Sequence, residues 1–445
     1  MIQRIKTTVR ELRADTHMRE VGRGTLVAFT LKVGGSGLAF AFNVAVARLL
    51  GTQGAGIYFL ALSITTISSV VGQVGLDSAL LRFVAIRATH EAWAGVKGVY
   101  KLGMRIAVVA SGTITVIVFL ASPWIATTIF KKPDLSETLR WMSLSILPFS
   151  LLNIHAESLK GLRLIRDAMI VQSIGVPFVG LLLIMPSAHA AGVLGVGIAY
   201  VVSVLLVAVL AGWIWRRAVS KHNIVAALFP FKDIWASCRP LWGVSILNGA
   251  VLPWMPFFLL GIWSTSEEVG IFGAALRVSM LVSFFLFAVN SVVAQKFASL
   301  YSKGEIEVLG RLSRNSALML TVLASPALLV MIFKGEWIMG LYGKAFAAGS
   351  TVLGILAFGQ LVNAICGPVG FLLTMCGHER KLQNTTVVSL VLQLSLCVAL
   401  IPKFGMVGAA IAMAGGVISN NFIAIFYVRQ LIGIAYPLKF RENGA

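Results

Sequence analysis

VGIFGAALRVSMLVSFFLFAVNSVVAQKFASL, residues Val269 to Leu300, is the stretch of sequence that decides the fold. At a rise of about 1.5 Å per residue, a helix of this length crosses a lipid bilayer. The stretch is mostly apolar, yet Arg277 lies about two turns inside its start, where a cation is costly unless it faces a wet cavity. A related pattern occurs earlier in the chain, at an offset of 214, where Gly56-Ile57-Tyr58 corresponds to Gly270-Ile271-Phe272. One predicted helix therefore carries both an internal duplication and an unusual charge.

The amino-acid composition is typical of a membrane protein. Hydrophobic residues make up 58% of the sequence and charged residues only 12%, whereas soluble domains have about 45–50% apolar and about 25% charged residues. Apolar runs long enough to span a bilayer recur from residue 25 to residue 430. We therefore predict an all-α, polytopic membrane protein with about 12 transmembrane helices. The four cysteines, which lack CxxC spacing, are expected to be small core residues.

The net charge of +20 is explained by membrane topology. With twelve spans, 28 Lys and Arg residues fall on the side that holds both termini, seven fall on the other side, and Lys32 and Arg277 fall inside spans. The positive-inside rule makes the basic side cytoplasmic. We predict a basic amphipathic segment at 1–24, an N-lobe of six spans at 25–215, a cytoplasmic linker at 216–239, a C-lobe of six spans at 240–430 and a cytoplasmic tail at 431–445.

The duplication extends along both lobes. Corresponding residues recur in order at offsets of 213 to 216: Gly161 with Gly377, Pro186 with Pro402, and Gly192, Gly195 and Ala199 with Gly405, Gly408 and Ala412. Because each unit has an even number of spans, the two units are parallel repeats related by an axis along the membrane normal. The expected architecture is two six-helix lobes around a central cavity, and the expected motion is rocking of one lobe against the other.

Three segments resemble a known family. The run from Val46 through Gly51 to Tyr58, followed by GLDSALLRFVA at 75–85, is similar to the start of bacterial polysaccharide flippases. The VGIFGAALR segment at 269–277 resembles the matching signature in the eighth helix of these proteins. They are the O-antigen and exopolysaccharide flippases of the multidrug/oligosaccharidyl-lipid/polysaccharide exporter superfamily, and the resemblance covers nearly the whole chain.

This resemblance implies a function. The substrate would be a polyprenyl-diphosphate-linked oligosaccharide, moved by alternating access from the cytoplasmic to the outer leaflet of a bacterial inner membrane, with both termini in the cytoplasm. The implied partners are this lipid-linked glycan, membrane lipids, a coupling ion (H⁺ or Na⁺) and polysaccharide polymerase machinery. No cofactor and no nucleic acid is expected.

Such a substrate requires cations for the diphosphate and hydrogen-bonding groups for the sugars. Arg277 is the leading candidate, and its alternative role is a structural one, pairing with helix carbonyls. Lys32 is the second cation within a span, although its ammonium could also reach back to the interface. Polar candidates in the spans are Asn43, Gln73, Asn248 and Asn290. Each of these could instead hold helices together.

A cytoplasmic gate is predicted from charges at equivalent helix ends. Arg82 corresponds to Lys296, and Glu91 and Glu305 follow them by nine residues each. Asp77 lies just inside the same end. Opposite charges could latch this side when the cavity opens outward, whereas the alternative is that Arg82 and Lys296 only anchor helix ends at lipid phosphates.

The acidic residues discriminate between three functions. Of these residues, only Glu157 lies clearly within a predicted span, where it is spaced to pair with Lys160. A cation-coupled multidrug exporter of the same superfamily would be expected to hold a deep carboxylate, whereas the corresponding helices here carry Lys32 and Arg277. A glycosyltransferase or polymerase would need large polar loops with paired acidic residues, and the outer loops are short. The sequence therefore favours a flippase, with the multidrug exporter as the alternative, and we expect no enzyme and no metal site.

Overall fold

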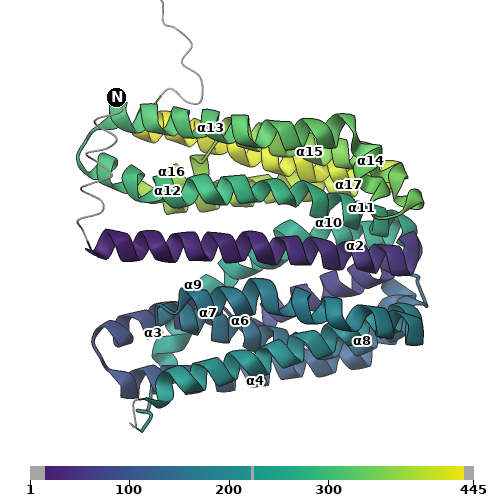
Figure 1. The fold of residues 1–445 in the computed structure, drawn as a ribbon, viewed down its shortest axis with the longest axis horizontal. Coiled ribbons are helices and arrows are strands. Elements are labelled where there is room, and N and C mark those ends of the chain that lie inside the picture. Colours follow the sequence, from purple (N-terminus) through teal and green to yellow (C-terminus); the bar gives the residue numbers. More distant parts are fainter. Residues whose placement is uncertain (1–15, 222–224, 435–445) are drawn as a thin grey trace, which may run out of the picture.

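The computed structural model describes residues 16–221 and 225–434 of the 445 residues. In these ranges the chain forms helices and short connections, with no strand (Figure 1). The N-terminal half contains α2 (Thr16–Gln73), α3 (Leu76–Thr89), α4 (Trp93–Trp124), η1 (Ile125–Ile129), α5 (Leu135–Met142), η2 (Ser143–Ser145), α6 (Ile146–Gly161), α7 (Ile165–Met169), η3 (Ile170–Gly175) and α8 (Val176–Ser220).

The C-terminal half repeats this organisation. It contains α9 (Phe231–Ser245), η4 (Ile246–Val251), α10 (Leu252–Trp263), α11 (Ser266–Ser279), η5 (Met280–Val282), α12 (Ser283–Ser302), α13 (Ile306–Phe333), α14 (Gly335–Gly340), η6 (Lys344–Gly349), α15 (Ser350–Cys366), α16 (Val369–Met375) and α17 (Glu379–Ile432). The elements η1, η3 and η4 are π-helical, and η2, η5 and η6 are 3₁₀-helical.

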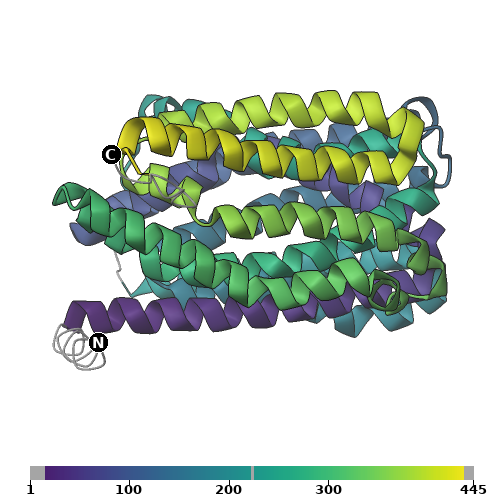
Figure 2. The same cartoon turned by 90° about the horizontal axis from the view of Figure 1, so that it is seen from above.

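Among the described residues, eight helical stretches are long and apolar enough to span a membrane. Three of them, within α2, α8 and α17, contain a break in helical geometry at Gly51, Gly192 and Gly405. The 54 residues of α17 would extend about 80 Å as one rod, more than twice the hydrocarbon thickness. Figure 2 instead shows α17 folded back into two antiparallel arms. The chain is thus an all-helical membrane protein, as predicted, and a total of twelve crossings stays a prediction.

The predicted duplication has a counterpart in the backbone. Gly192 (φ 54°, ψ −127°) and Gly405 (φ 52°, ψ −128°) adopt the same left-handed conformation, which suits glycine because it has no Cβ atom. A Cβ atom on Gly195 would collide with the carbonyl group of Ser187, and one on Gly408 would lie 2.5 Å from the carbonyl oxygen of Leu400. Both pairs of glycines have the same offset in the sequence, so the turn that joins the last two arms of each half is built in the same way.

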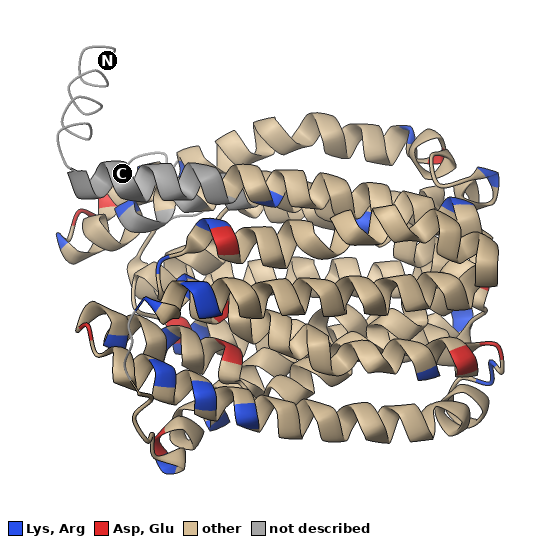
Figure 3. Cartoon of the chain, turned by 60° about the horizontal axis from the view of Figure 1, so that its bottom comes forward, with Lys and Arg blue, Asp and Glu red and all other residues tan. Residues whose placement is uncertain are grey.

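Basic residues gather at one end of the bundle. Figure 3 shows most Lys and Arg positions at the end where the described chain begins and stops, and we call this the basic end. The other end, where the arms of α17 meet, carries fewer charges (Figures 2 and 3). The distribution agrees with the charge asymmetry counted in the sequence, and the cytoplasmic placement of the basic end stays a prediction.

Two helix boundaries differ from those expected. The helix α8 continues to Ser220 and α9 begins at Phe231, so the connection without helix is shorter than the predicted linker at 216–239. Pro230 precedes the first residue of α9, a position that suits proline because the first N–H groups of a helix lack partners. The helix α2 begins at Thr16 and passes through the predicted boundary at residue 24 without a break. Residues 1–15 of the predicted amphipathic segment, residues 222–224 of the linker and residues 435–445 of the tail lie outside the described residues.

Candidate functional site

The two halves meet through a pair of glycines on α2 and α11. A Cβ atom on Gly56 would overlap the carbonyl oxygen of Ser266, and one on Gly270 would overlap that of Thr52. Each such atom would also lie 3.0 Å from the backbone nitrogen of the other glycine. Thr52 and Ser266 have the same offset in the sequence as the two glycines. This contact, which we call the glycine contact, is therefore symmetric. Such symmetry is expected if the axis that relates the two halves passes through it.

Lys132 joins the halves near this contact. It lies between η1 and α5, and its ammonium donates hydrogen bonds to the carbonyl oxygens of Gly261 (2.5 Å) and Ser264 (2.7 Å) at the end of α10. The last carbonyl groups of a helix lack partners within the helix, and a cation there also interacts favourably with the helix dipole. Burial lowers the pKa of Lys132. The lysine of one half thus caps a helix of the other.

Two further contacts cross between the halves at the same end. The Nε atom of Arg48 donates to the carbonyl oxygen of Leu341 at 2.8 Å. The hydroxyl group of Thr52 lies 3.2 Å from Oε1 of Glu267. We call this end, which is opposite the basic end, the closed end.

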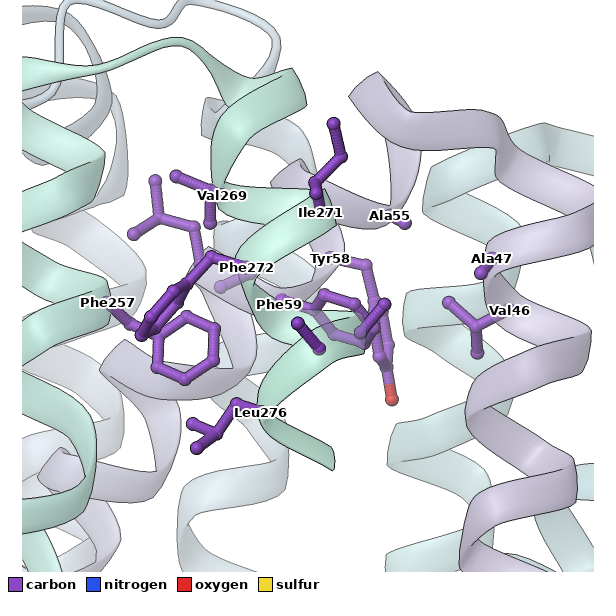
Figure 4. Packing of buried hydrophobic residues seen from close by; sticks show 14 of the residues in the cluster. Val46, Ala47, Ala55, Tyr58, Phe59, Phe257, Val269, Ile271, Phe272 and Leu276 are labelled. Carbon is purple, nitrogen blue, oxygen red and sulfur yellow. The ribbon is translucent and has the colours of Figure 1, made fainter. Parts of the chain in front are cut away.

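Arg277 lies on α11, eleven residues after Ser266 and so about 16 Å along the helix. Its guanidinium carbon lies 3.9 Å from the centre of the Phe59 ring and 5.9 Å from that of Phe257. Its Nη1 atom donates to the carbonyl oxygen of Gly273 at 3.0 Å. Figure 4 shows Phe59, Phe257 and the neighbouring Leu276 around this part of α11. No described carboxylate lies within 4 Å of the guanidinium.

Aromatic faces and one carbonyl group therefore stabilise the Arg277 charge without neutralising it. The residue that corresponds to Arg277 in the N-terminal half is Ser63, which is fully buried and donates to the carbonyl oxygen of Leu60. The cation is thus a departure from the internal symmetry, present in one half only.

Two tyrosine hydroxyl groups accompany Arg277. The side chains of Tyr58 and Tyr342 are fully buried, and among the described residues neither hydroxyl group has a hydrogen-bond partner. Each of them has an electrostatic interaction with Arg277, without a hydrogen bond to it. Figure 4 shows the Tyr58 ring between α11 and the arm that carries Val46 and Ala47. Buried polar groups are nearly always satisfied in native proteins, so these two hydroxyl groups without partners are unusual, and each could donate a hydrogen bond to a polar group that reached it.

Lys32 lies far from this group along α2, in a polar cluster of the N-terminal half. The predicted pair of Glu157 and Lys160 is confirmed by a 2.6 Å ion pair, and the side-chain amide of Gln172 lies 3.3 Å from the same carboxylate oxygen and 3.4 Å from Oδ1 of Asn153. The charge of Lys160 acts on the half-buried Lys32. The structure therefore separates the two predicted cations into different surroundings.

The predicted polar ligands divide into two groups. The amide nitrogens of Asn43 and Asn248 donate to carbonyl oxygens one turn earlier in their own helices, at 2.6 and 3.2 Å. Gln73 and Asn290 are buried, and Oδ1 of Asn290 has no hydrogen-bond partner among the described residues. A role in sugar binding stays a prediction for all four.

The predicted gate residues lie at the basic end without ion pairs. Among the side chains that the structure describes, only those of Lys160 and Glu157 approach within 4 Å as an ion pair. The side chains of Arg82, Glu91, Lys296 and Glu305 are exposed. Asp77 is half-buried at the start of α3, with the hydroxyl group of Ser245 3.5 Å from both of its carboxylate oxygens. Burial, with a smaller effect of the Glu157 charge, raises the pKa of Asp77. The latch is not formed in this state, and its formation in another state stays a prediction.

The residues missed by the sequence analysis are Lys132, Tyr58 and Tyr342. Tyr58 belongs to the repeated Gly-Ile-aromatic segment, which could have drawn attention to it. Lys132 and Tyr342 lie in short connections with no local pattern, and they were not identifiable from the sequence.

Proteins with similar sequences include a probable flippase and a transport protein of glycan biosynthesis. A probable low-salt glycan biosynthesis flippase, Agl15, from Haloferax volcanii is 29% identical over 239 residues, which cover 52% of this chain and 50% of that protein. The alignment thus spans about half the length of this relative. The succinoglycan biosynthesis transport protein ExoT of Rhizobium meliloti is 26% identical over 79% of this chain and 68% of its own length.

Solved structures share the fold. An inward-facing multidrug resistance MATE family transporter of the MOP superfamily superposes with a TM-score of 0.74 at 14% identity, covering 92% of this chain and 98% of its own. The inward closed conformation of the lipid II flippase MurJ also gives a TM-score of 0.74, at 13% identity, over 91% of this chain and 87% of its own.

A family match covers more than half of the sequence. Residues 21–294 match the family described as polysaccharide biosynthesis protein. This range holds the family-like segments near residues 46–58 and 269–277, both glycines of the glycine contact, Lys132 and Arg277. The chain belongs to the polysaccharide biosynthesis protein family.

Proposed function

We propose that this protein is a flippase that moves a polyprenyl-diphosphate-linked oligosaccharide from the cytoplasmic to the outer leaflet of a bacterial inner membrane. The observation that carries the proposal is Arg277, a deep cation with no described carboxylate within 4 Å, which interacts electrostatically with two tyrosine hydroxyl groups that have no hydrogen-bond partner. A diphosphate would neutralise the guanidinium and accept from the hydroxyl groups, and the exposed polyprenyl chain would stay in lipid.

Alternating access provides the route. The two halves touch closely at the closed end, through the glycine contact and Lys132, while the predicted gate residues at the basic end form no ion pair with any described residue. This pattern fits a state that receives substrate from the basic, cytoplasmic side, with the substrate reaching Arg277 beneath the closed end. Rocking of the halves would then separate the glycine contact and bring the charges of the basic end together. A coupling ion, H⁺ or Na⁺, and a polymerase partner belong to the same proposal.

The alternative function is a cation-coupled multidrug exporter, which the similarity to the MATE fold supports. Such a mechanism needs a carboxylate deep in the membrane, because a cationic drug and a coupling cation both require a negative partner. Among the described residues, the fully buried polar and charged side chains include no Asp or Glu. The flippase is therefore the better-supported function.

Reconstitution of the full chain in liposomes separates the two functions. Lipid-linked oligosaccharide with a fluorescent glycan is placed in both leaflets, and the fraction that an external quencher or glycosidase reaches is followed over time. We expect the glycan to change leaflets faster with protein than in protein-free liposomes. Cationic drug uptake without glycan movement would overturn the proposal in favour of the exporter.

A further inference from the structure

A groove on the outer flank of the N-terminal half plays no part in the proposed transport. It consists of two adjoining cavities. One, of about 840 Å³, lies between α4, α6 and α8, and the other, of about 540 Å³, lies between α4 and Ala226. The two share Lys97, Tyr100, Met104 and Val108. Figure 1 shows α4 and α8 on the side of the bundle away from α13 and α17. The groove therefore faces the surrounding lipid and not the other half of the protein.

The charges of the groove have one sign. Lys97, Lys101 and Arg105 follow one another at intervals of four residues on α4, so they form a stripe on one helix face. Arg216, on α8, lines the larger cavity, whereas Lys101 and Arg105 line the smaller one, and Lys97 lines both. Among the described residues that line the two cavities none is acidic, and the side chains of Lys101, Arg105 and Arg216 are exposed.

The polarity of the groove changes along its length. The basic residues lie toward the basic end, where α4 begins and α8 stops. About 4.5 Å beyond Arg105 along α4 the wall becomes apolar with Val108, and Val209 faces the same cavity from α8. Val108 and Val209 are 42% and 64% exposed, which is expected for side chains in contact with lipid tails. Charge at the membrane surface followed by apolar surface at depth is the order found in a phospholipid.

The floor of the groove contains a hydrogen bond between two side chains and a pair of stacked rings. The hydroxyl group of Tyr100 lies 2.8 Å from Nδ1 of His155, and the Tyr100 ring stacks on Trp215 with ring centres 4.2 Å apart and an angle of 21° between the planes. Rings from three different helices, α4, α6 and α8, therefore pack together at the floor of the groove.

We propose that this groove is a binding site for an anionic phospholipid, whose phosphate lies among Lys101, Arg105 and Arg216 and whose acyl chain runs along Met104 and Val108. Basic pockets between transmembrane helices recognise anionic headgroups through charge and hydrogen bonds. The phospholipid is preferred over the transported lipid-linked glycan because the groove lies on the flank away from the C-terminal half. The inference is independent of the proposed transport function.

Native mass spectrometry of the full chain, purified in detergent, tests the site. Dioleoyl phosphatidylglycerol is compared with dioleoyl phosphatidylcholine, which has the same chains and no net charge, and with soluble glycerophosphoglycerol, which has no chains. We expect retention of phosphatidylglycerol only. The triple variant Lys101→Gln, Arg105→Gln, Arg216→Gln should weaken this binding about ten- to hundredfold.

A matched triple variant, Lys303→Gln, Arg311→Gln, Arg380→Gln, removes the same charges from exposed positions of the C-terminal half and should bind as the unmodified chain does.

A second variant, Val108→Trp, narrows the groove without changing charge and should also weaken binding. Its control, Val116→Trp, lies two turns further along α4 at an exposed position outside the groove. Equal loss in both triple variants, equal binding of phosphatidylcholine, or displacement of phosphatidylglycerol by a lower concentration of polyprenyl diphosphate would overturn the proposal.

Discussion

Gly56 and Gly270 bring two helices of different halves into backbone contact, and each glycine meets the other in the same way. A side chain on either one would enter the space of a carbonyl group on the other helix. Contacts of this kind are common between transmembrane helices, where small residues allow close packing without a hydrophobic driving force. The segment that is repeated in the sequence therefore also forms the interface between the two halves.

Enlarging Gly56 should open this contact. Gly56→Leu places a side chain against the Ser266 carbonyl group, and overpacking of this kind costs about 1–3 kcal/mol. We expect lower thermal stability and a loss of glycan export in cells. The control is Gly112→Leu on α4, where a Cβ atom would meet nothing within 4 Å. Equal effects of the two substitutions would show that the glycine contact has no special role.

Lys132 should stabilise the closed end. Lys132→Gln removes the cation that caps the end of α10, and we expect the closed state to lose about 1–2 kcal/mol. Accessibility is read from Ala274→Cys, in a background without the four native cysteines. Ala274 is buried one turn from Gly270 on the same face of α11. An impermeant thiol reagent added outside should label this cysteine faster in the Lys132→Gln variant.

The neighbouring Lys131 gives the matched control, because its side chain is exposed. Lys131→Gln should leave the labelling rate unchanged. If both substitutions increase labelling alike, loss of positive charge in this connection is the cause, and capping by Lys132 is not.

Arg277 should be needed for its charge and its shape. Arg277→Ala should lower the export rate at least about tenfold, because a charge-assisted hydrogen bond contributes about 1.5–3 kcal/mol. Arg277→Lys should keep part of the activity, since lysine supplies a point charge without the bidentate geometry. The control is Arg140→Ala, which also removes a guanidinium from an aromatic face, that of Phe119, at an exposed position. Normal surface glycan with Arg277→Ala at normal protein levels would exclude the proposed role.

The features that could be predicted from the sequence are those with a local or periodic pattern. Composition and the length of the apolar runs identified the all-helical membrane fold, and the offsets of Gly192 and Gly405 identified two equivalent turns. The pair of Glu157 and Lys160 was predictable because residues three apart share a helix face.

The features that could not be predicted depend on packing between distant segments. Lys132 meets carbonyl groups 129 and 132 residues away, and nothing in a short connection specifies such a partner. The depth of Arg277 was predictable, whereas its contact with the Phe59 ring was not, because the rotation of α11 against α2 is set by the glycine contact.

The topology should follow the charge asymmetry. Cysteines at Gln53 and Thr265, both exposed at the closed end, should react with impermeant reagents added to intact cells, and a cysteine at Lys232 should react only after the cells are opened. The physical reason is retention of basic loops on the cytoplasmic side. Labelling at position 232 from outside would reverse the orientation and, with it, the proposed direction of transport.

The last prediction concerns the gate at the basic end. Arg82 and Glu305 are exposed and form no ion pair with any described residue in this state. If opening of the closed end brings them together, Arg82→Glu should impair export and an added Glu305→Arg should partly restore it. An exposed pair contributes about 0–1 kcal/mol, which biases an equilibrium between two states without fixing it, so the rescue should be partial. If Arg82 only anchors a helix end at lipid phosphates, Arg82→Glu loses that anchor and the second substitution restores nothing. Export of the double variant at or below the level of Arg82→Glu alone would therefore exclude the gate.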